Sequence, residues 1–236
     1  LRVVKTVSSA LASALAVLHD EEREIGAAVL DFGAGLCELT IWEKQGLVYT
    51  AVIPVGGHNI TEDIAAGLST PIAVAEELKV TQGHAYNTSY TNGTTIQVRG
   101  AGGRGTYNYH INNLYMIIEV RFIEIFSHVR SQLANYGIND SLPGGLVLTG
   151  GASKMPGLID AADEALNMSV RIGIPRDVKE LSTILNDPAM ATSYGLLVCA
   201  SMRYNTEIPR AKLPGGPPQQ RGLLKEIVRK VKGFTI

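Results

Sequence analysis

The chain has few cysteines, no long apolar run and no metal-binding motif, and each absence excludes a class of protein. Its 236 residues include two cysteines, Cys37 and Cys199, which are too few and too far apart for a disulfide framework. No run approaches the roughly 18 apolar residues of a membrane-spanning helix, and the first residues lack the order of a signal peptide. The histidines have no metal-ligand spacing, so we expect them to be structural or surface residues. These features favour a reducing, cytoplasmic location.

The net charge of −1 is unevenly distributed. Residues 221–236 hold five basic side chains and one acidic one, whereas the rest of the chain has 16 basic and 21 acidic side chains. The sequence therefore predicts a basic appendage on an acidic body. With 45% hydrophobic residues, the chain is long enough to bury a core in one or two domains. It begins with Leu1 instead of methionine, and we expect it to be a piece of a longer protein.

The stretch 27–42 predicts a strand, a tight glycine turn and a second strand. An apolar run ends at Asp31, and Gly33 and Gly35 are expected to turn the chain with positive φ. Backbone N–H groups in such a turn form a concavity that suits a phosphate, and Asp31 could hold a metal ion or water. A plain hairpin turn is the alternative, because many hairpins contain Gly-x-Gly.

Hydrophobic periodicity and turn residues predict the remaining elements, which combine helices with a sheet. Up to residue 109 they are a helix over 6–18, a charged connection at 20–24, a third strand at 47–53, helices from about 59–61 and over 72–80, and loops at 83–109 around one strand at 95–99. After it they are a long helix over 114–133, a buried strand ending at 150–151, a helix to 166, a strand at 169–174 and a helix over 188–202. The first three strands predict an antiparallel meander, and the loop-rich region predicts a small inserted lobe.

Two residue pairs in these elements have both a functional and a structural interpretation. Glu76 and Lys79 lie three residues apart on one helix face, as a ligand site or as a solvated ion pair. Gly150 and Gly151 end a buried strand before a helix, which allows the close approach of a ligand or close packing alone.

The long helix offers Arg121, Glu124 and His128 on a face away from its apolar side, and we expect this trio to point outward. A salt bridge beside a neighbouring imidazole is the structural alternative.

The end of the chain predicts a tethered amphipathic helix. Residues 206–220 are rich in proline, glycine and glutamine, which is typical of a disordered tether. In residues 221–236 every charged side chain falls outside one apolar arc, a pattern that favours reversible binding to an anionic membrane over docking on a core. Stable attachment would need several chains side by side. The apolar arc consists of Leu223, Leu224, Ile227, Val228, Val231 and Phe234.

The order of these motifs resembles the actin-like ATPase superfamily and, within it, the FtsA family of bacterial cell-division proteins. The motifs are Asp31-Phe-Gly-Ala-Gly, Ile53-Pro-Val-Gly-Gly57, Thr61-Glu-Asp-Ile64, Glu76-x-x-Lys79, the Ile117–Phe126 helix, Gly150-Gly151 and the basic tail. The resemblance covers essentially the whole chain. It implies an α/β, actin-like (ribonuclease H-like) fold: a mixed sheet flanked by helices, a small inserted lobe and a C-terminal amphipathic helix.

The resemblance also implies site residues, cofactors and partners. It places Asp31, Gly33, Ala34 and Gly35 at the phosphates of ATP, with Asp31 holding Mg²⁺ through water. It places Glu76, Lys79, Gly150, Gly151 and Ala152 at the adenosine. It places Arg121 and Glu124 at the C-terminal tail of FtsZ. That tail is short and acidic, which suits an exposed arginine. Other protomers in a filament and an anionic membrane are further partners, and no nucleic-acid partner is expected.

Two departures from the family pattern bear on hydrolysis. The family's loop has a further glycine and hydroxyl residues where this chain has Ala34, Leu36 and Cys37. A donor to the terminal phosphate is therefore missing, and hydrolysis is expected to be weak or absent. The first phosphate loop of the family is also missing from the N-terminal side, so we expect this chain to form one side of a nucleotide cleft. The intact protein, not this piece, is expected to bind ATP well.

We therefore predict an ATP-binding adaptor that polymerises and anchors the FtsZ ring to the cytoplasmic face of the membrane at the septum. The alternatives are another actin-superfamily ATPase, such as a sugar kinase or a chaperone-type protein, or a scaffold with a decayed site. The predicted domains are 1–25 as part of an incomplete first lobe, 26–190 as a second lobe with an inserted subdomain at about 83–143, 191–203 as a closing helix, 204–220 as a linker and 221–236 as a membrane-binding helix.

Overall fold

The structure is a computed structural model that describes residue 3 and residues 6–86, 93–138, 142–176 and 185–205. Its helices are α1 (Ser9–Val17), α2 (Asp20–Ile25), α3 (Gly57–Gly67), α4 (Ile72–Gln82), α5 (Ile111–Tyr136), α6 (Leu158–Leu166) and α8 (Ala191–Asn205). Its strands are β1 (Ala27–Phe32), β2 (Cys37–Glu43), β3 (Gly46–Ile53), β4 (Thr95–Arg99), β5 (Thr106–His110), β6 (Leu146–Thr149) and β7 (Val170–Ile172). Three short 3₁₀ turns, η1 (Ala101–Gly103), η2 (Gly151–Lys154) and η3 (Pro188–Met190), complete the described elements.

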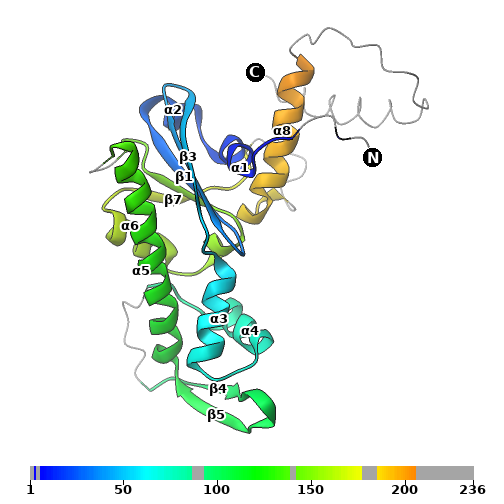
Figure 1. Ribbon diagram of the computed structural model, residues 1–236, viewed down its shortest axis with the longest axis vertical. Helices are drawn as coiled ribbons and strands as arrows, with labels where there is room; N and C mark the ends of the chain where they lie inside the picture. Colours follow the sequence, from blue (N-terminus) through cyan, green and yellow to red (C-terminus); the bar gives the residue numbers. More distant parts are fainter. Residues whose placement is uncertain (1–2, 4–5, 87–92, 139–141, 177–184, 206–236) are drawn as a thin grey trace, which may run out of the picture.

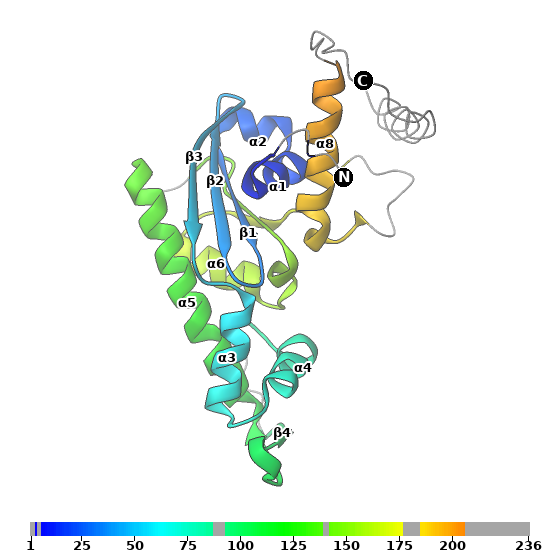
Figure 2. The same cartoon turned by 45° about the vertical axis from the view of Figure 1, so that its right-hand side comes forward.

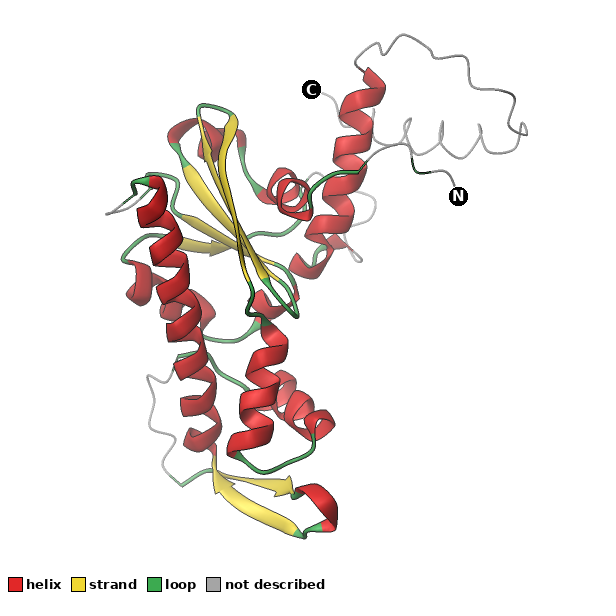
Figure 3. Ribbon diagram, in the orientation of Figure 1, coloured by secondary structure: helices red, strands yellow, loops and turns green. Residues whose placement is uncertain are grey.

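A mixed five-stranded sheet with helices on both faces forms the larger part of the molecule (Figures 1 and 3). The strand order is β3-β2-β1-β6-β7, in which β1 runs antiparallel to β2 and parallel to β6. Helices α1 and α8 lie on one side of the sheet and α5 and α6 on the other (Figure 1). Because both faces are covered, all six residues of β1 are buried and alternate between two cores.

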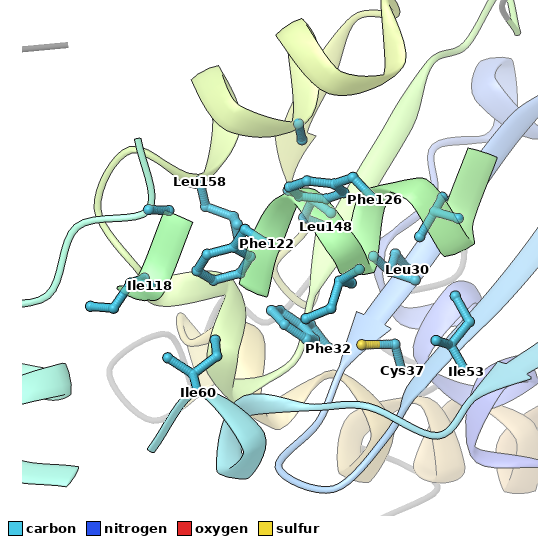
Figure 4. Close-up of a cluster of buried hydrophobic side chains, with 14 of the residues drawn as sticks. Leu30, Phe32, Cys37, Ile53, Ile60, Ile118, Phe122, Phe126, Leu148 and Leu158 are labelled. Carbon is cyan, nitrogen blue, oxygen red and sulfur yellow. The ribbon is translucent and has the colours of Figure 1, made fainter. Parts of the chain in front are cut away.

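The core between the sheet and α5 contains the large aromatic side chains. Phe32 at the end of β1 meets Phe122 of α5 edge to face at 5.6 Å, and Phe122 stacks on Phe126 one turn later at 6.1 Å. Figure 4 shows both α5 rings beside Leu158 of α6 and Leu148 of β6. This packing fixes the end of β1, where the predicted site begins.

Small residues allow α1 and α8 to touch along their backbones. A Cβ atom at Gly195 of α8 would lie 1.8 Å from the carbonyl oxygen of Ala12 in α1, which leaves no space for any other residue type. Alanine and serine predominate in α1, and α8 has Gly195 at the contact, which explains the close approach from the sequence.

A smaller lobe of α3, α4 and the β4–β5 hairpin lies at the far end of α5 (Figure 2). The hairpin is bound to the α3–α4 connection, where the hydroxyl of Thr70 donates to the Arg99 carbonyl at 2.7 Å and the hydroxyl of Tyr109 donates to the Leu68 carbonyl at 3.1 Å. The hairpin and the two helices therefore form one packed unit.

The structure confirms the antiparallel β1–β2–β3 meander, the α4 and β4 segments and the long α5 helix. Two predictions were wrong. Residues 20–24 are not a connection but the helix α2, whose start is capped because the backbone N–H of His19 donates to Glu22 at 2.8 Å. Residues 106–110 form β5, whose alternation is hidden by polar side chains on a strand with no fully buried residue.

Candidate functional site

A cavity of about 940 Å³ opens between α3, α4 and the η2 turn. Five residues predicted from separate motifs line it, namely Ala34, Glu76, Lys79, Gly151 and Ala152. Its other lining residues are Gly57, His58, Ile60, Thr61, Ile72, Ala73, Val80, Lys154, Met155 and Pro156. Of the remaining predicted residues, Asp31 lies near the end of β1, Gly33 and Gly35 in the turn that follows it, and Gly150 between β6 and η2.

The hairpin turn between β1 and β2 differs from its prediction in one respect. Neither Gly33 nor Gly35 has positive φ, so the expected left-handed turn is wrong. The turn is instead held by hydrogen bonds: Gly33 N–H donates to the Leu36 carbonyl at 3.0 Å, and the N–H groups of Gly57 and His58 at the start of α3 donate to the carbonyls of Gly33 and Ala34. These bonds fix the loop against α3 without a left-handed residue.

Two N–H groups of this turn remain available. Among the described residues, the backbone N–H groups of Ala34 and Gly35 have no hydrogen-bond partner. Gly56 allows the turn to lie this close to α3, because a Cβ there would be 2.6 Å from the Ala34 oxygen. An anion that enters the cavity at Ala34 therefore meets unpaired N–H donors.

Asp31 lies at the end of β1, on the sheet face that packs against α8. Asp31 is 8% exposed, and its carboxylate accepts a hydrogen bond of 2.9 Å from the hydroxyl of Thr192 in α8. Gly150 packs directly beside it, with φ of +86° and space for no Cβ, since that atom would be 2.5 Å from Asp31 Oδ1. Close packing is thus sufficient to explain Gly150, whereas Gly151 faces the cavity.

Lys79 is the centre of a polar network that joins α4 to the first turn of α3. Its Nζ donates to the Gly57 carbonyl at 2.9 Å, to Thr61 Oγ1 at 2.8 Å and to Glu76 Oε2 at 2.7 Å. The Thr61 hydroxyl also bonds Glu76 Oε2. Burial would raise the pKa of Glu76, but the hydrogen bonds from Lys79 and Thr61 outweigh it and hold the pKa below its ordinary value. Glu76 is therefore an ionised acceptor.

The cavity rim carries two further basic groups that the sequence did not single out. Lys154 pairs with Asp187 at 2.8 Å, and this hydrogen bond lowers the pKa of Asp187. His58 lies on the first turn of α3, 3.6 Å from Glu62. The signal for His58 was its place directly after Gly56-Gly57, where a helix begins beside the hairpin turn.

Cys37 does not face the cavity. The side chain is fully buried near Leu30 and Ile53, and its thiol donates to the Val55 carbonyl at 3.0 Å (Figure 4). Burial raises the pKa of this thiol far above its ordinary value. Leu36, in contrast, is exposed at the turn.

Arg121 is not directed freely outward as predicted. Its guanidinium makes a bidentate pair with Asp63 of α3 at 2.6 and 2.7 Å and bonds Glu124 at 2.7 Å, which leaves the side chain 23% exposed. Arg121 and Glu124 line a shallow depression of about 340 Å³ with the exposed apolar residues Met116 and Val120. Sequence periodicity placed these residues on one surface but could not show the partner on α3.

The described residues hold no helix that is long and apolar enough to cross a membrane. In the same residues, no cluster of three or more His, Cys, Asp or Glu side chains is placed to hold a metal ion. The predicted linker and the predicted membrane-binding residues of 221–236 lie outside the part of the chain that the structure describes.

The fold defines an actin-like protein. Solved structures with the same fold include MreB5 of Spiroplasma citri bound to ADP, with a TM-score of 0.66 and 17% identity over 84% of this chain and 60% of that one. A non-polymerising MamK mutant bound to AMPPNP has a TM-score of 0.59 and 15% identity over 81% of this chain and 58% of that one. These likenesses confirm the predicted fold class.

Sequence comparison then gives the family. The family profile described as "Cell division protein FtsA" matches residues 28–195. The chain is 37% identical to the cell division protein FtsA of Pseudomonas aeruginosa over 84% of this chain and 48% of that protein, and 34% identical to the FtsA of Bacillus subtilis over 86% of this chain and 46% of that protein. The chain belongs to the FtsA family of actin-like cell-division proteins, and it spans about half the length of these relatives.

Proposed function

We propose that the cavity is one side of an ATP site and that the nucleotide acts on conformation and assembly more than as a substrate. The observation that supports this most strongly is the gathering of Ala34, Glu76, Lys79, Gly151 and Ala152 around one cavity, although they come from three separate motifs. A cavity of about 940 Å³ is also in the size range of ligand sites.

The phosphates belong at the hairpin turn in this proposal. The unpaired N–H groups of Ala34 and Gly35 are suited to bind phosphate oxygens, and Gly33 shapes the turn. Asp31 fits Mg²⁺, which retains most of its waters and takes few protein carboxylates. Thr192 already orients that carboxylate. When bound, the ion would neutralise phosphate charge.

The adenosine belongs at α4 and the Gly150-Gly151 turn. Glu76 Oε2 is engaged by Lys79 and Thr61, whereas Oε1 has no partner among the described residues and can accept a hydrogen bond from a ribose hydroxyl. All three hydrogens of the Lys79 ammonium already have acceptors, so in this arrangement Lys79 orients Glu76. Gly151 and Ala152 leave space for the nucleoside.

Weak or absent hydrolysis remains our prediction. Glu76 is the single carboxylate among the described residues that line the cavity, and the proposal places it at the adenosine, away from the phosphates. Asp31 is assigned to Mg²⁺, so no described cavity residue is left as the acidic general base that a sugar kinase requires. The proposed role is that of an adaptor and scaffold.

The proposed partners are the FtsZ tail, other protomers and the membrane. The depression with Arg121 and Glu124 offers apolar contact at Met116 and Val120 besides charge, which suits a short peptide. Residues 221–236 would hold the protein at the cytoplasmic face of the membrane, at the septum, and filament formation would strengthen that attachment. The close α1–α8 contact supports the proposal that residues 1–25 and 191–203 belong to a shared first lobe.

The test is the ATP affinity of the full-length protein. Glu76→Gln keeps the size of the side chain but removes the ionised acceptor, and we expect about a tenfold loss of affinity. Glu77→Gln is the matched control, because Glu77 is the next residue of α4, is exposed and does not line the cavity. Equal affinity of the Glu76 variant and the wild type would contradict the proposed adenosine position.

A further inference from the structure

A second groove lies between α5 and α6, away from the proposed ATP site. It has a volume of about 410 Å³, with Phe122 and Phe126 at its base and Ala161 and Ala165 of α6 along one wall. Ile123 is 60% exposed at its edge. The two alanines make the groove, because larger side chains at these positions would fill the space against α5.

The walls of this groove are acidic. Glu119 of α5 and Glu164 of α6 line it, and α6 adds Asp160 and Asp163 on its exposed surface without any basic residue. The Tyr86 hydroxyl donates to Glu164, and that bond, with the nearby carboxylates, raises the pKa of Tyr86.

Arg130 is the basic residue among the described groove residues. It is bonded to the Ala165 carbonyl at the end of α6. The groove therefore presents an apolar base between walls that carry two carboxylates and one guanidinium, a net negative charge.

The last segment of the chain has the complementary pattern. Residues 221–236 combine five basic side chains with an apolar arc, whereas the rest of the chain is acidic. Residues 206–220 separate this segment from the end of α8, and fifteen residues can span up to about 50 Å. Fully extended, fifteen residues would therefore exceed the length of α5, which is about 39 Å at 1.5 Å per residue.

We propose that the α5–α6 groove is a docking site for residues 221–236 of the same chain when no membrane is present. The apolar arc packs on Phe122, Phe126 and Ile123, and the lysine and arginine side chains face Glu119 and Glu164. The same arc and the same basic residues are those assigned above to the membrane, so an anionic surface competes with the groove for the segment. This competition rests on the proposed membrane role, but docking itself does not.

The test for docking is a cross-link within the full chain. The double variant Ile123→Cys, Val231→Cys is treated with a short bismaleimide at low protein concentration without lipid. The yield of internally cross-linked monomer is then measured. The natural cysteines Cys37 and Cys199 are buried, which limits background reaction. Ile25→Cys replaces Ile123→Cys in the matched control, because Ile25 is a 55% exposed isoleucine on α2 and does not line the groove. Docking predicts a severalfold higher yield for the Ile123 pair, and equal yields would overturn it.

Charge reversal separates docking from chance proximity. Glu119→Lys with Glu164→Lys should lower the cross-link yield about tenfold, the factor expected for two surface ion pairs of moderate strength. Glu21→Lys with Glu24→Lys makes the same charge change on exposed residues of α2 and should leave the yield unchanged. An equal decrease in both double variants would overturn the specific role of the groove.

Vesicles then test the competition. Vesicles of phosphatidylethanolamine and phosphatidylglycerol should reduce the yield for the Ile123 pair, whereas phosphatidylcholine vesicles should not. If the cross-link forms without lipid but anionic vesicles leave it unchanged and do not bind the protein, the membrane role fails and docking remains. If the protein binds vesicles but the two cysteine pairs cross-link equally, docking fails and the membrane role remains.

Discussion

Two hydrogen-bond networks connect α3 to a neighbouring helix, one through Lys79 of α4 and the other through Arg121 of α5. They differ in the kind of acceptor that the cation bonds. Lys79 is 12% exposed and bonds one carboxylate and two neutral oxygens, one of which is the main-chain carbonyl of Gly57. Arg121 is 23% exposed and bonds two carboxylates, those of Asp63 and Glu124. The first network is neutral and faces the cavity, and the second carries a net negative charge and faces a shallow depression.

The difference indicates what each network can do. Two of the three Lys79 acceptors, Gly57 and Thr61, are buried, whereas the Glu76 side chain is 48% exposed. The carboxylates of Asp63 and Glu124 are 30% and 48% exposed and can turn to solvent. The Lys79 network is therefore a fixed part of the cavity wall, whereas the Arg121 network can rearrange for a partner.

The largest predicted effect is on stability and comes from matched substitutions. Lys79→Met should lower the free energy of unfolding by about 2 kcal/mol, because it removes the charged donor from the buried oxygens of Gly57 and Thr61, although the bond between them remains. Arg121→Met should cost less than about 1 kcal/mol, because its partners reach water. Urea unfolding of both variants measures the difference, and equal losses would remove the distinction between the two networks.

The next effect is on the affinity for an FtsZ tail peptide. An acidic peptide that uses Arg121 must displace Asp63 or Glu124, so Glu124→Gln should strengthen binding severalfold by releasing one competitor. Arg121→Met should weaken binding about tenfold. Calorimetric titration with the peptide measures both, with Glu77→Gln as a control of the same charge change on α4. Weaker binding of Glu124→Gln would show that Glu124 is itself a contact.

The smallest effect is the pH dependence of the Lys79 network. The pKa of Glu76 is lower in the folded chain than its ordinary value of 4.5. Its contribution to stability is therefore complete above pH 4.5 and is lost as the pH falls through the folded pKa. Glu76→Gln should make the unfolding free energy less dependent on pH below this value. If the free energy of unfolding of Glu76→Gln falls as steeply below pH 4.5 as that of the wild type, ionisation of Glu76 does not contribute to stability.

The sequence predicted which motifs meet but not how they are held. Glu76 and Lys79 were identified by their spacing, whereas their shared partner Thr61 lies on another helix and has no local signal. Gly33 and Gly35 suggested a left-handed turn, yet the N–H groups of α3 determine the loop from outside it. Cys37 was expected near the phosphates because its sequence position adjoins the turn, but strand alternation directs the side chain into the core.

Partners that are distant in the sequence also explain why β5 and the ion pair of Arg121 were not predicted. The polar side chains of β5 concealed a strand that is set by pairing with β4, since its partner residues are ten or so positions away. Arg121 was placed on the correct helix, but its pair with Asp63 of α3 depends on tertiary packing. Local pattern therefore predicted most of the elements, but it could not show the long-range partners of the candidate residues.

The most direct test of the central claim is an amide spectrum of the ¹⁵N-labelled protein with and without ATP and Mg²⁺. The account predicts large shifts for the backbone N–H signals of Ala34, Gly35 and Gly151, because the first two donors are unpaired and Ala34 and Gly151 line the cavity. The signals of Met116 and Val120, on the opposite depression, should move far less. Shifts confined to the α5 depression, or none at Ala34 and Gly35, would contradict a nucleotide site at this cavity.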